Sequence, residues 1–196
     1  MTSFGVEVPV ENIPDYGFYR MLYNSGKVVN GPKFPNLKSI GDYGLAEAFR
    51  GCSSLSSVEL PSVLNSIGQY GCNYAFSRSG IKAVENLNLS GIGQYGCEGM
   101  FSSCSALEKV DGLSAESLSA YALSGMFSNC SSLTSVQDLH IDNSEDANKK
   151  SGNSKCDGMF DGCSSLLSVG GLIKGLYGQY ALRNTFRNCK SLKDAS

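Results

Sequence analysis

Eight cysteines are the residues of this chain with the widest choice of chemistry. A thiolate can ligate zinc, form a disulfide or attack a substrate as a nucleophile. No two of the cysteines form a Cys-x-x-Cys pair, and the chain has a single histidine, His140, to complete a metal site or to activate a nucleophile. The sequence also lacks an HExxH motif and a glycine-rich phosphate loop. We therefore predict no metal site, no cofactor and no catalytic residue, and expect His140 to lie on the surface.

The cysteines belong to a phrase that the chain repeats: AFRGCSSLSSV, MFSSCSALEKV, MFSNCSSLTSV, MFDGCSSLLSV and TFRNCKSLKDA. We call the aromatic residue of each phrase the anchor, and two weaker copies add an anchor each. The anchors are Leu22, Phe49, Phe76, Phe101, Phe127, Phe160 and Phe186, with gaps of 27, 27, 25, 26, 33 and 26 residues. A period of roughly 20 to 50 residues predicts a solenoid, in which each copy buries its apolar face only against its neighbours.

Apolar residues recur within each copy at the spacing of one helix face. Cys97, Met100, Phe101 and Cys104 stand at i, i+3, i+4 and i+7. We therefore expect a helix of about ten residues in each copy, followed by a serine-rich turn and one or two short strands such as SVEL and AVENLNL. Stacked copies predict an α/β repeat, with short helices on one side of the solenoid and a parallel ladder of short strands on the other.

Each cysteine occupies one of two positions in the copy, four residues before the anchor or three after it. Leucine takes the first position in other copies, as Leu45, Leu123 and Leu182. A metal ligand would not exchange with leucine, whereas a small core residue would. We predict buried free thiols. Because adjacent rungs lie about 4.7 to 5 Å apart, a disulfide between neighbours, Cys104–Cys130 or Cys163–Cys189, stays open as an alternative.

The remaining organisation follows from the period. Residues 1–15 are expected to form an N-terminal capping strand, because apolar residues alternate from Phe4 to Val10. Residues 16–196 are expected to form one solenoid of about seven repeats of 25–27 residues, the last of them incomplete, with an inserted loop near 140–155. The sequence stops just past Leu192, so we expect a fragment of a longer array or self-association through an uncapped C-terminal end.

Composition limits the partners. The net charge is −2 and 17% of residues are charged, so no basic patch points to nucleic acid. No run of 18 apolar residues predicts membrane insertion, and MTSFGVEVPVEN lacks the pattern of a signal peptide.

The string "F, two residues, C, two residues, L, then SV", preceded by Ile40-Gly41, Ile67-Gly68 or Ile92-Gly93, resembles the BspA-like leucine-rich repeat family of bacterial surface proteins. The resemblance implies a leucine-rich-repeat solenoid that is displayed on the cell surface or secreted. It also implies a non-enzymatic binding or adhesion module for a protein, glycoprotein or glycan partner, and it supplies no site residues. The alternative is a structural or receptor-binding component of a larger assembly such as a phage virion appendage.

Three parts of the chain are candidates for binding, and the last of them is the inserted loop near 140–155, which is expected to be a solvated surface excursion or, alternatively, a recognition loop. The first is the strand ladder, where outward residues differ between copies; the tentative partner-binding residues are Glu59, Glu85, Asn88, Asp111, Gln137 and His140, whose acidic bias favours a basic or polar partner. The second is a column of tyrosines six residues before the anchors: Tyr16, Tyr43, Tyr70, Tyr95, Tyr121 and Tyr180, with Lys155 expected in the copy after the insertion. We expect this column to be a stacked ladder whose role is packing or, alternatively, contact with a ligand such as a sugar.

Overall fold

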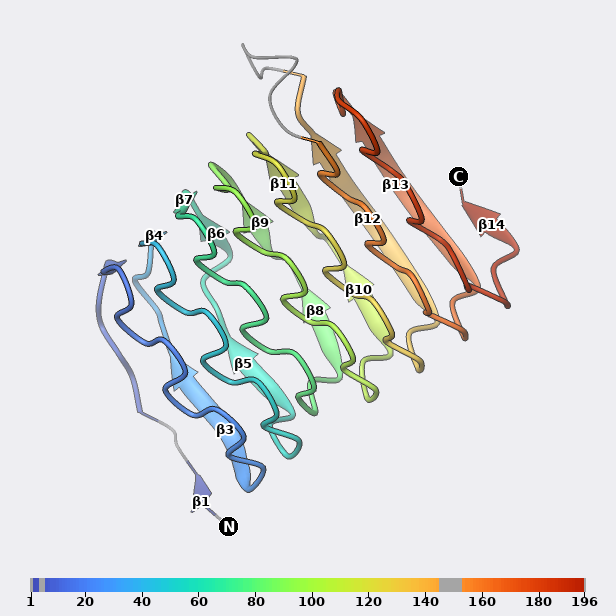
Figure 1. The fold of residues 1–196 in the computed structure, drawn as a ribbon. Helices are drawn as coiled ribbons and strands as arrows, with labels where there is room; N and C mark the ends of the chain where they lie inside the picture. The colour runs from blue at the N-terminus through green and yellow to red at the C-terminus, as the bar shows by residue number, and fades with distance from the viewer. Residues whose placement is uncertain (1, 4–5, 145–152, 196) are drawn as a thin grey trace.

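The computed structural model describes residues 2–3, 6–144 and 153–195, and over these residues the chain is a solenoid of short parallel strands (Figure 1). The strands are β1 (Thr2–Ser3), β2 (Asn12–Ile13), β3 (Val28–Lys33), β4 (Ser39–Ile40), β5 (Ser57–Glu59), β6 (Val63–Leu64), β7 (Ser66–Ile67), β8 (Ala83–Glu85), β9 (Asn88–Leu89), β10 (Lys109–Asp111), β11 (Ser114–Glu116), β12 (Ser135–Asp142), β13 (Ser168–Lys174) and β14 (Asp194–Ala195). The two ends of the chain lie at opposite ends of the array.

Strands of successive copies pair in parallel at equivalent positions. Equivalent strands therefore line up in three strips that run along the solenoid. The first strip contains β1, β3 and β5. After a break in the strand pairing it continues with β8, β10 and the first halves of β12 and β13, and it ends at β14. The second strip contains β6, β9, β11 and the second halves of β12 and β13. The third strip contains β2, β4 and β7, and isolated bridges continue it to Ile92 and Leu118.

The segment expected to be helical is not a helix in any copy, and this part of the sequence prediction is wrong. From six residues before each anchor to three after it, the chain forms what we call the turn ribbon, as in residues 43–52. Alternate N–H groups close turns to the carbonyl three residues earlier, as from Ala46 to Tyr43 at 3.1 Å. The other N–H groups donate to the next copy, as from Phe49 to the carbonyl of Ala75 at 2.8 Å. A helix would direct each of these donors to the residue four positions earlier in the same copy.

Left-handed backbone conformations at every fourth residue make the turn ribbon possible. In the copy of Phe127 they fall at Tyr121, Gly125 and Asn129, with φ of 58°, 57° and 60°. A right-handed helix cannot contain such residues, and glycine and asparagine adopt them at the least cost. Because the ribbon repeats every four residues, it buries nearly the same positions as a helix of 3.6 residues per turn. The apolar spacing therefore fits both structures.

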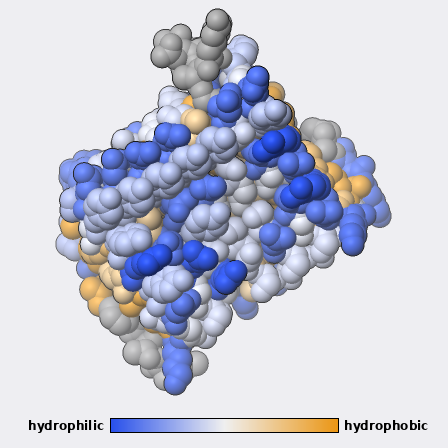
Figure 2. All heavy atoms as spheres, viewed as in Figure 1, coloured by the Kyte–Doolittle hydropathy of each residue, from blue (hydrophilic) through white to orange (hydrophobic). Residues whose placement is uncertain are grey.

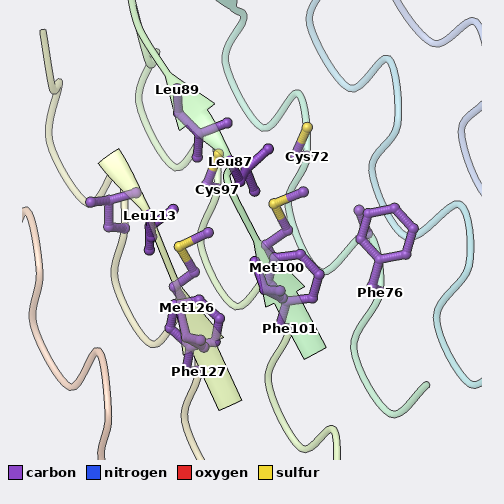
Figure 3. Close-up of a cluster of buried hydrophobic side chains, with 14 of the residues drawn as sticks. Cys72, Phe76, Leu87, Leu89, Cys97, Met100, Phe101, Leu113, Met126 and Phe127 are labelled. Carbon is purple, nitrogen blue, oxygen red and sulfur yellow. The ribbon is translucent and has the colours of Figure 1, made fainter. Parts of the chain in front are cut away.

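The core is a set of columns that run along the solenoid (Figure 3). The anchors from Phe49 to Phe186 stack with ring centroids 5.1 to 5.7 Å apart and planes within 12° of parallel. Each stacked pair adds about 0.5 to 1.5 kcal/mol beyond the burial of its area. Leu22, the first anchor, is partly buried and packs against this core. Stability therefore comes from contacts between copies, as the sequence predicted.

Candidate functional site

The thiols are core groups with a definite hydrogen-bonding role. Seven of the eight cysteines are buried, Cys189 is half-buried, and all eight are free, which confirms the prediction of buried free thiols. Each cysteine three residues after an anchor donates its S–H to the carbonyl of the preceding anchor at 3.1 to 3.2 Å; the pairs are Cys52–Leu22, Cys104–Phe76, Cys130–Phe101, Cys163–Phe127 and Cys189–Phe160. The position therefore suits a small, weak donor, and Ser79 occupies it in the copy of Phe76.

Burial also makes these thiols poor nucleophiles. It raises the pKa of Cys156 and of Cys163 to about 12. It raises the pKa of Cys130 well above its ordinary value too. The thiolate is the reactive and metal-binding form, so the fold suppresses both kinds of chemistry. In the described part of the chain, no group of three or more histidine, cysteine or acidic side chains is placed to hold a metal ion.

The tyrosines form the expected ladder over five copies. Tyr16, Tyr43, Tyr70, Tyr95 and Tyr121 stack in order, with centroids 4.7 to 4.9 Å apart and planes within 19° of parallel. The expectation for Lys155 is wrong by one residue. Ser154 stands six residues before Phe160 and has the φ of 57° that the tyrosines share, whereas Lys155 is fully buried in the neighbouring column.

Stacking determines what the tyrosine ladder can offer a ligand. Each inner ring covers the faces of its neighbours, so the ladder presents ring edges and phenol groups along its length. Sugar stacking needs an open ring face, and only a terminal ring of the stack, such as Tyr16 at 59% exposure, has one. Burial and the neighbouring Tyr43 and Tyr95 raise the pKa of the Tyr70 phenol, in keeping with a packed column. This geometry favours packing as the main role of the ladder.

The six residues expected on the strand face fall into two groups and one outlier. Glu85, Asp111 and Gln137 lie side by side at one register on β8, β10 and β12. Asn88 and His140 lie on either side of Ser114 in the second strip, so His140 is an exposed strand residue. Glu59 lies in the preceding copy of the first strip, where β5 pairs with β3 and forms no ladder with β8.

Lysines offset the acidic character expected of the strand face. The ammonium group of Lys33 lies 2.7 Å from the carboxylate of Glu59. Lys109 forms an ion pair with Glu85. Each acidic partner raises the pKa of its lysine, and both lysines are solvent-exposed. Such exposed pairs contribute about 0 to 1 kcal/mol to stability, but they leave the strip much less acidic than its carboxylates alone suggest.

A shallow pocket of about 240 Å³ lies on the second strip around Ser114. Its lining residues are Val63, Asn65, Asn88, Leu89, Ser90, Ser114, Ala115, Glu116 and His140. The Ser114 hydroxyl donates to Asn88 Oδ1 at 2.5 Å, which holds the amide across the floor between two copies. The lining thus offers amide, hydroxyl, carboxylate and imidazole groups beside small apolar patches. Sequence analysis found Asn88 and His140 but missed Ser114 and Glu116, which become neighbours only through the register of β9, β11 and β12.

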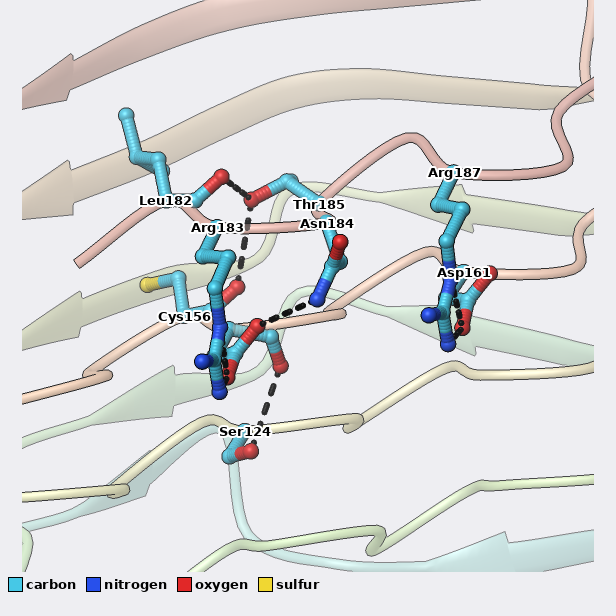
Figure 4. Close-up of polar contacts among 9 residues, drawn as sticks. Ser124, Cys156, Asp161, Leu182, Arg183, Asn184, Thr185 and Arg187 are labelled. Atoms are coloured by element: carbon cyan, nitrogen blue, oxygen red, sulfur yellow. Dashed lines mark hydrogen bonds and ion pairs between the residues drawn. The ribbon is translucent and has the colours of Figure 1, made fainter. Parts of the chain in front are cut away.

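The turn-ribbon face carries ordered ion pairs between copies (Figure 4). Arg183 contacts Asp157 at 2.6 Å, and Arg187 contacts Asp161 at 2.5 Å. The hydrogen bond from Arg187 holds the pKa of the Asp161 carboxyl below its ordinary value. These pairs join the last two turn ribbons, so we assign them to stacking.

The inserted loop is described only at its edges. The Asp142 carboxylate accepts hydrogen bonds from the Ser144 amide at 2.9 Å and hydroxyl at 2.6 Å, and its other oxygen lies 2.8 Å from the ammonium group of Lys174. The middle of the loop, residues 145–152, lies outside the described residues, as does part of the expected capping strand, residues 4–5. The described N-terminal residues pair with β3, through β1 and through a bridge between Glu7 and Lys33.

Comparison with known proteins places the chain in a family. The family described as "BspA type Leucine rich repeat region" matches residues 11–144 in 6 copies. The solved structure of a leucine-rich repeat protein from T. pallidum is similar, with a TM-score of 0.52 and 23% identity over 96% of this chain and 78% of that one. A leucine-rich repeat protein from Bacteroides ovatus has a TM-score of 0.35 and 22% identity over 100% of this chain and 60% of that one. No curated protein sequence gives a significant match. Over its described residues the chain has no helix that could cross a membrane.

Proposed function

The chain belongs to the BspA-type leucine-rich repeat family, and from this premise we propose that it is a non-enzymatic binding module of a surface-exposed or secreted bacterial protein. Repeats of this family are typically protein-interaction scaffolds and often surface adhesion modules. The suppressed thiols agree with a role in binding rather than in catalysis.

The observation that carries the proposal is the pocket around Ser114. Every copy buries the same kinds of side chain in the core, whereas the residues around this pocket differ from copy to copy: Val63, Asn88, Ser114, His140 and Leu172 share one register. Variation on a rigid ladder is how one scaffold presents a specific surface. The pocket is open and offers both polar and apolar groups, so it suits a protein side chain or a single sugar unit.

The partner that fits is a protein or glycoprotein segment laid across the strips. Glu85, Asp111 and Gln137 stand beside the pocket in the first strip and give the segment a second row of polar contacts. Because Lys109 pairs with Glu85, this row offers charges of both signs. We therefore expect recognition by hydrogen bonds and shape more than by net charge.

The test is binding to an immobilised mixture of extracellular-matrix glycoproteins, before and after enzymatic removal of their glycans. Ser114→Arg fills the pocket and is expected to weaken binding about tenfold or more. Ser131→Arg is the matched control, because Ser131 is exposed and lies outside the pocket. Circular dichroism of both variants checks that the fold is retained.

Equal binding by the wild type and by Ser114→Arg would contradict a site at this pocket. Charge reversal of Glu59, Glu85 and Asp111 together tests the first strip separately. Loss of binding on removal of the glycans would identify a glycan partner, and retention would identify a protein one.

A further inference from the structure

The face formed by the turn ribbons carries another pocket, of about 360 Å³, which extends along several copies. Tyr74 and Glu98 line one end of it, and Arg183 and Arg187 line the other. In the view of Figure 1 the turn ribbons pass in front of the strands, and the same view in Figure 2 shows a mostly hydrophilic face. A ligand that fits this pocket is therefore polar or charged.

Glycines leave the middle of this pocket open. Gly125 and Gly158 both stand two residues before an anchor, and a Cβ at either of them would meet nothing closer than 3.5 Å. Gly99 has the same position one copy earlier, but a Cβ there would overlap the ring of Tyr74, which covers it. The open part of the pocket thus lies over Gly125 and Gly158, and Tyr74 closes one end.

Aspartates on this face pair with arginines at the same position of the next copy (Figure 4). Asp157 and Arg183 both stand three residues before an anchor, and Asp161 and Arg187 both stand one residue after one. Each arginine donates from Nε and Nη2 to one carboxylate oxygen. The stacking of the copies therefore suits an ion pair between an acid and an arginine at one position of adjacent copies.

Glu98 lacks the partner that this pattern supplies. It stands three residues before Phe101, but the same position of the next copy is Ser124, whose hydroxyl donates to the carbonyl of Asp157 at 3.2 Å. Among the residues that the structure describes, no cation forms an ion pair with the Glu98 carboxylate, which accepts a hydrogen bond from the Asn73 side chain at 2.9 Å. Burial raises the pKa of the Glu98 carboxyl despite this bond, as expected for a half-buried carboxylate without a cation.

We propose that this pocket binds an arginine side chain of a protein partner, with its guanidinium against Glu98 in the space over Ser124 and Gly125. Asp157 and Asp161 are neutralised by their own arginines, so Glu98 gives the pocket a net negative charge. A planar guanidinium donates two parallel hydrogen bonds to a carboxylate, whereas an ammonium group acts as a point charge. The site therefore favours arginine over lysine, and it is separate from the strand-face pocket of the proposed function.

The experiment titrates the isotope-labelled chain with a short glycine–serine peptide that carries one arginine, and follows the amide resonances of Gly125 and Gly158 by NMR. The matched ligand is the same peptide with citrulline, which has nearly the same shape but no charge. Glu98→Gln removes the carboxylate charge, and Ser124→Arg supplies a guanidinium to the pocket from within the chain. Glu108→Gln is the charge-matched control, because Glu108 is exposed and lies outside the pocket.

Wild type and Glu108→Gln are expected to show saturable shifts of both glycine amides with the arginine peptide, and at least about tenfold weaker binding of the citrulline peptide. Glu98→Gln and Ser124→Arg are each expected to weaken binding of the arginine peptide at least about tenfold, because one removes the charge of the acceptor and the other occupies its space.

The absence of saturable shifts in the wild type would overturn the proposal. So would equal binding of the two peptides, shifts that bypass both glycines, or full binding by Glu98→Gln. Ser114→Arg, which fills the strand-face pocket, should bind the arginine peptide as the wild type does. A failure at one pocket can therefore be told apart from a failure at the other.

Discussion

In the five copies that have a cysteine three residues after the anchor, its thiol gives the preceding anchor carbonyl a second donor, beyond the N–H that closes the turn of that carbonyl. The carbonyl of Phe76, for example, accepts from the Ser79 amide at 3.1 Å and from the Cys104 thiol at 3.1 Å. A thiol is small enough for the close spacing of the copies and polar enough for this contact, whereas a leucine is neither. This explains why leucine replaces cysteine four residues before an anchor and does not replace it three residues after one.

Replacing Cys156 with leucine is expected to reduce the loss of stability at high pH. Burial raises the pKa of Cys156 from 9.0 to about 12, so the folded chain keeps a proton that the unfolded chain releases. The contribution of this thiol is therefore complete below pH 9 and is lost as the pH rises toward 12, at about 1.4 kcal/mol per pH unit. Urea unfolding between about pH 7 and pH 10.5 measures the slope.

Leu123→Cys is the converse control, because it adds a buried thiol to the same column. Leu123→Cys should make the free energy of unfolding fall more steeply with rising pH, whereas Cys156→Leu should make it fall less steeply. The same pH dependence in all three proteins would show that Cys156 ionises in the folded chain as readily as in the unfolded one.

At the scale of the element, hydrogen bonds to neighbouring copies hold the turn ribbon in place. Its conformation therefore depends on the stacking of the copies. Within itself, a single ribbon has only turns of four residues, each closed by an N–H bonded to the carbonyl three residues earlier, and several left-handed residues. Each left-handed residue other than glycine costs about 1 to 2 kcal/mol. For the tyrosines, stacking on neighbours in adjacent copies offsets much of this cost, at about 0.5 to 1.5 kcal/mol per pair. The ribbon is therefore stable only where copies adjoin.

Gly125→Ala distinguishes a turn ribbon from a helix, because the substitution should change the free energy of unfolding in opposite directions in the two structures. A Cβ at Gly125 would approach nothing closer than the Ser128 hydroxyl at 3.5 Å, so only its φ of 57° resists the substitution. We expect a loss of about 1 kcal/mol in the free energy of unfolding, whereas the same change in a helix would gain about as much. Urea denaturation measures the difference.

Gly170→Ala is the matched control, because a Cβ there would meet nothing within 4 Å and its φ is not in the left-handed region. It should leave stability nearly unchanged. A stabilising effect of Gly125→Ala would contradict the turn ribbon.

The sequence did carry a signal for the ribbon, in residues that the apolar pattern does not use. Gly158 and Gly162, like Asn184 and Asn188, are spaced by four in a segment that would be a helix interior. Glycine and asparagine are poor helix formers and the best left-handed residues, so their period of four distinguishes the two structures. Repeat length, core columns and parallel strips were predictable because each depends on spacing alone. The hydrogen-bond partners were not, because they lie in the next copy.

At the scale of the whole molecule, the register between copies decides which surface residues meet. Asn88 and His140 were predictable as outward residues, but their meeting around Ser114 depends on how β9, β11 and β12 align. The pairing of Lys109 with Glu85 depends on register in the same way, and it offsets the expected acidic bias. A single sequence gives the period but not this alignment. The pocket was therefore only partly predictable.

Removing one whole copy, residues 77–101, is expected to leave a shorter solenoid that still unfolds cooperatively. The deletion joins Phe76 to Ser102 and keeps every column in phase, because 25 residues separate the two anchors. Each copy contacts only its neighbours, so the free energy of unfolding should fall by the contribution of one copy and of one interface between copies. The dependence of unfolding free energy on urea should fall by about one eighth, in proportion to the 25 of 196 residues removed.

A half-copy deletion, residues 77–88, is the control, because it shifts every later column out of phase. It should abolish cooperative unfolding. Loss of folding in both deletions would show that the copies do not act as separable units.

The direction of the turn-ribbon ladder has a mechanical consequence. Its hydrogen bonds run along the line between the two ends of the chain, so a force that pulls those ends apart loads the bonds of one terminal copy before the next. A copy that detaches releases about 26 residues, or roughly 90 Å of extended chain, in exchange for a rise of about one ring spacing. A protein built this way lengthens in steps under tension while the remaining copies stay folded.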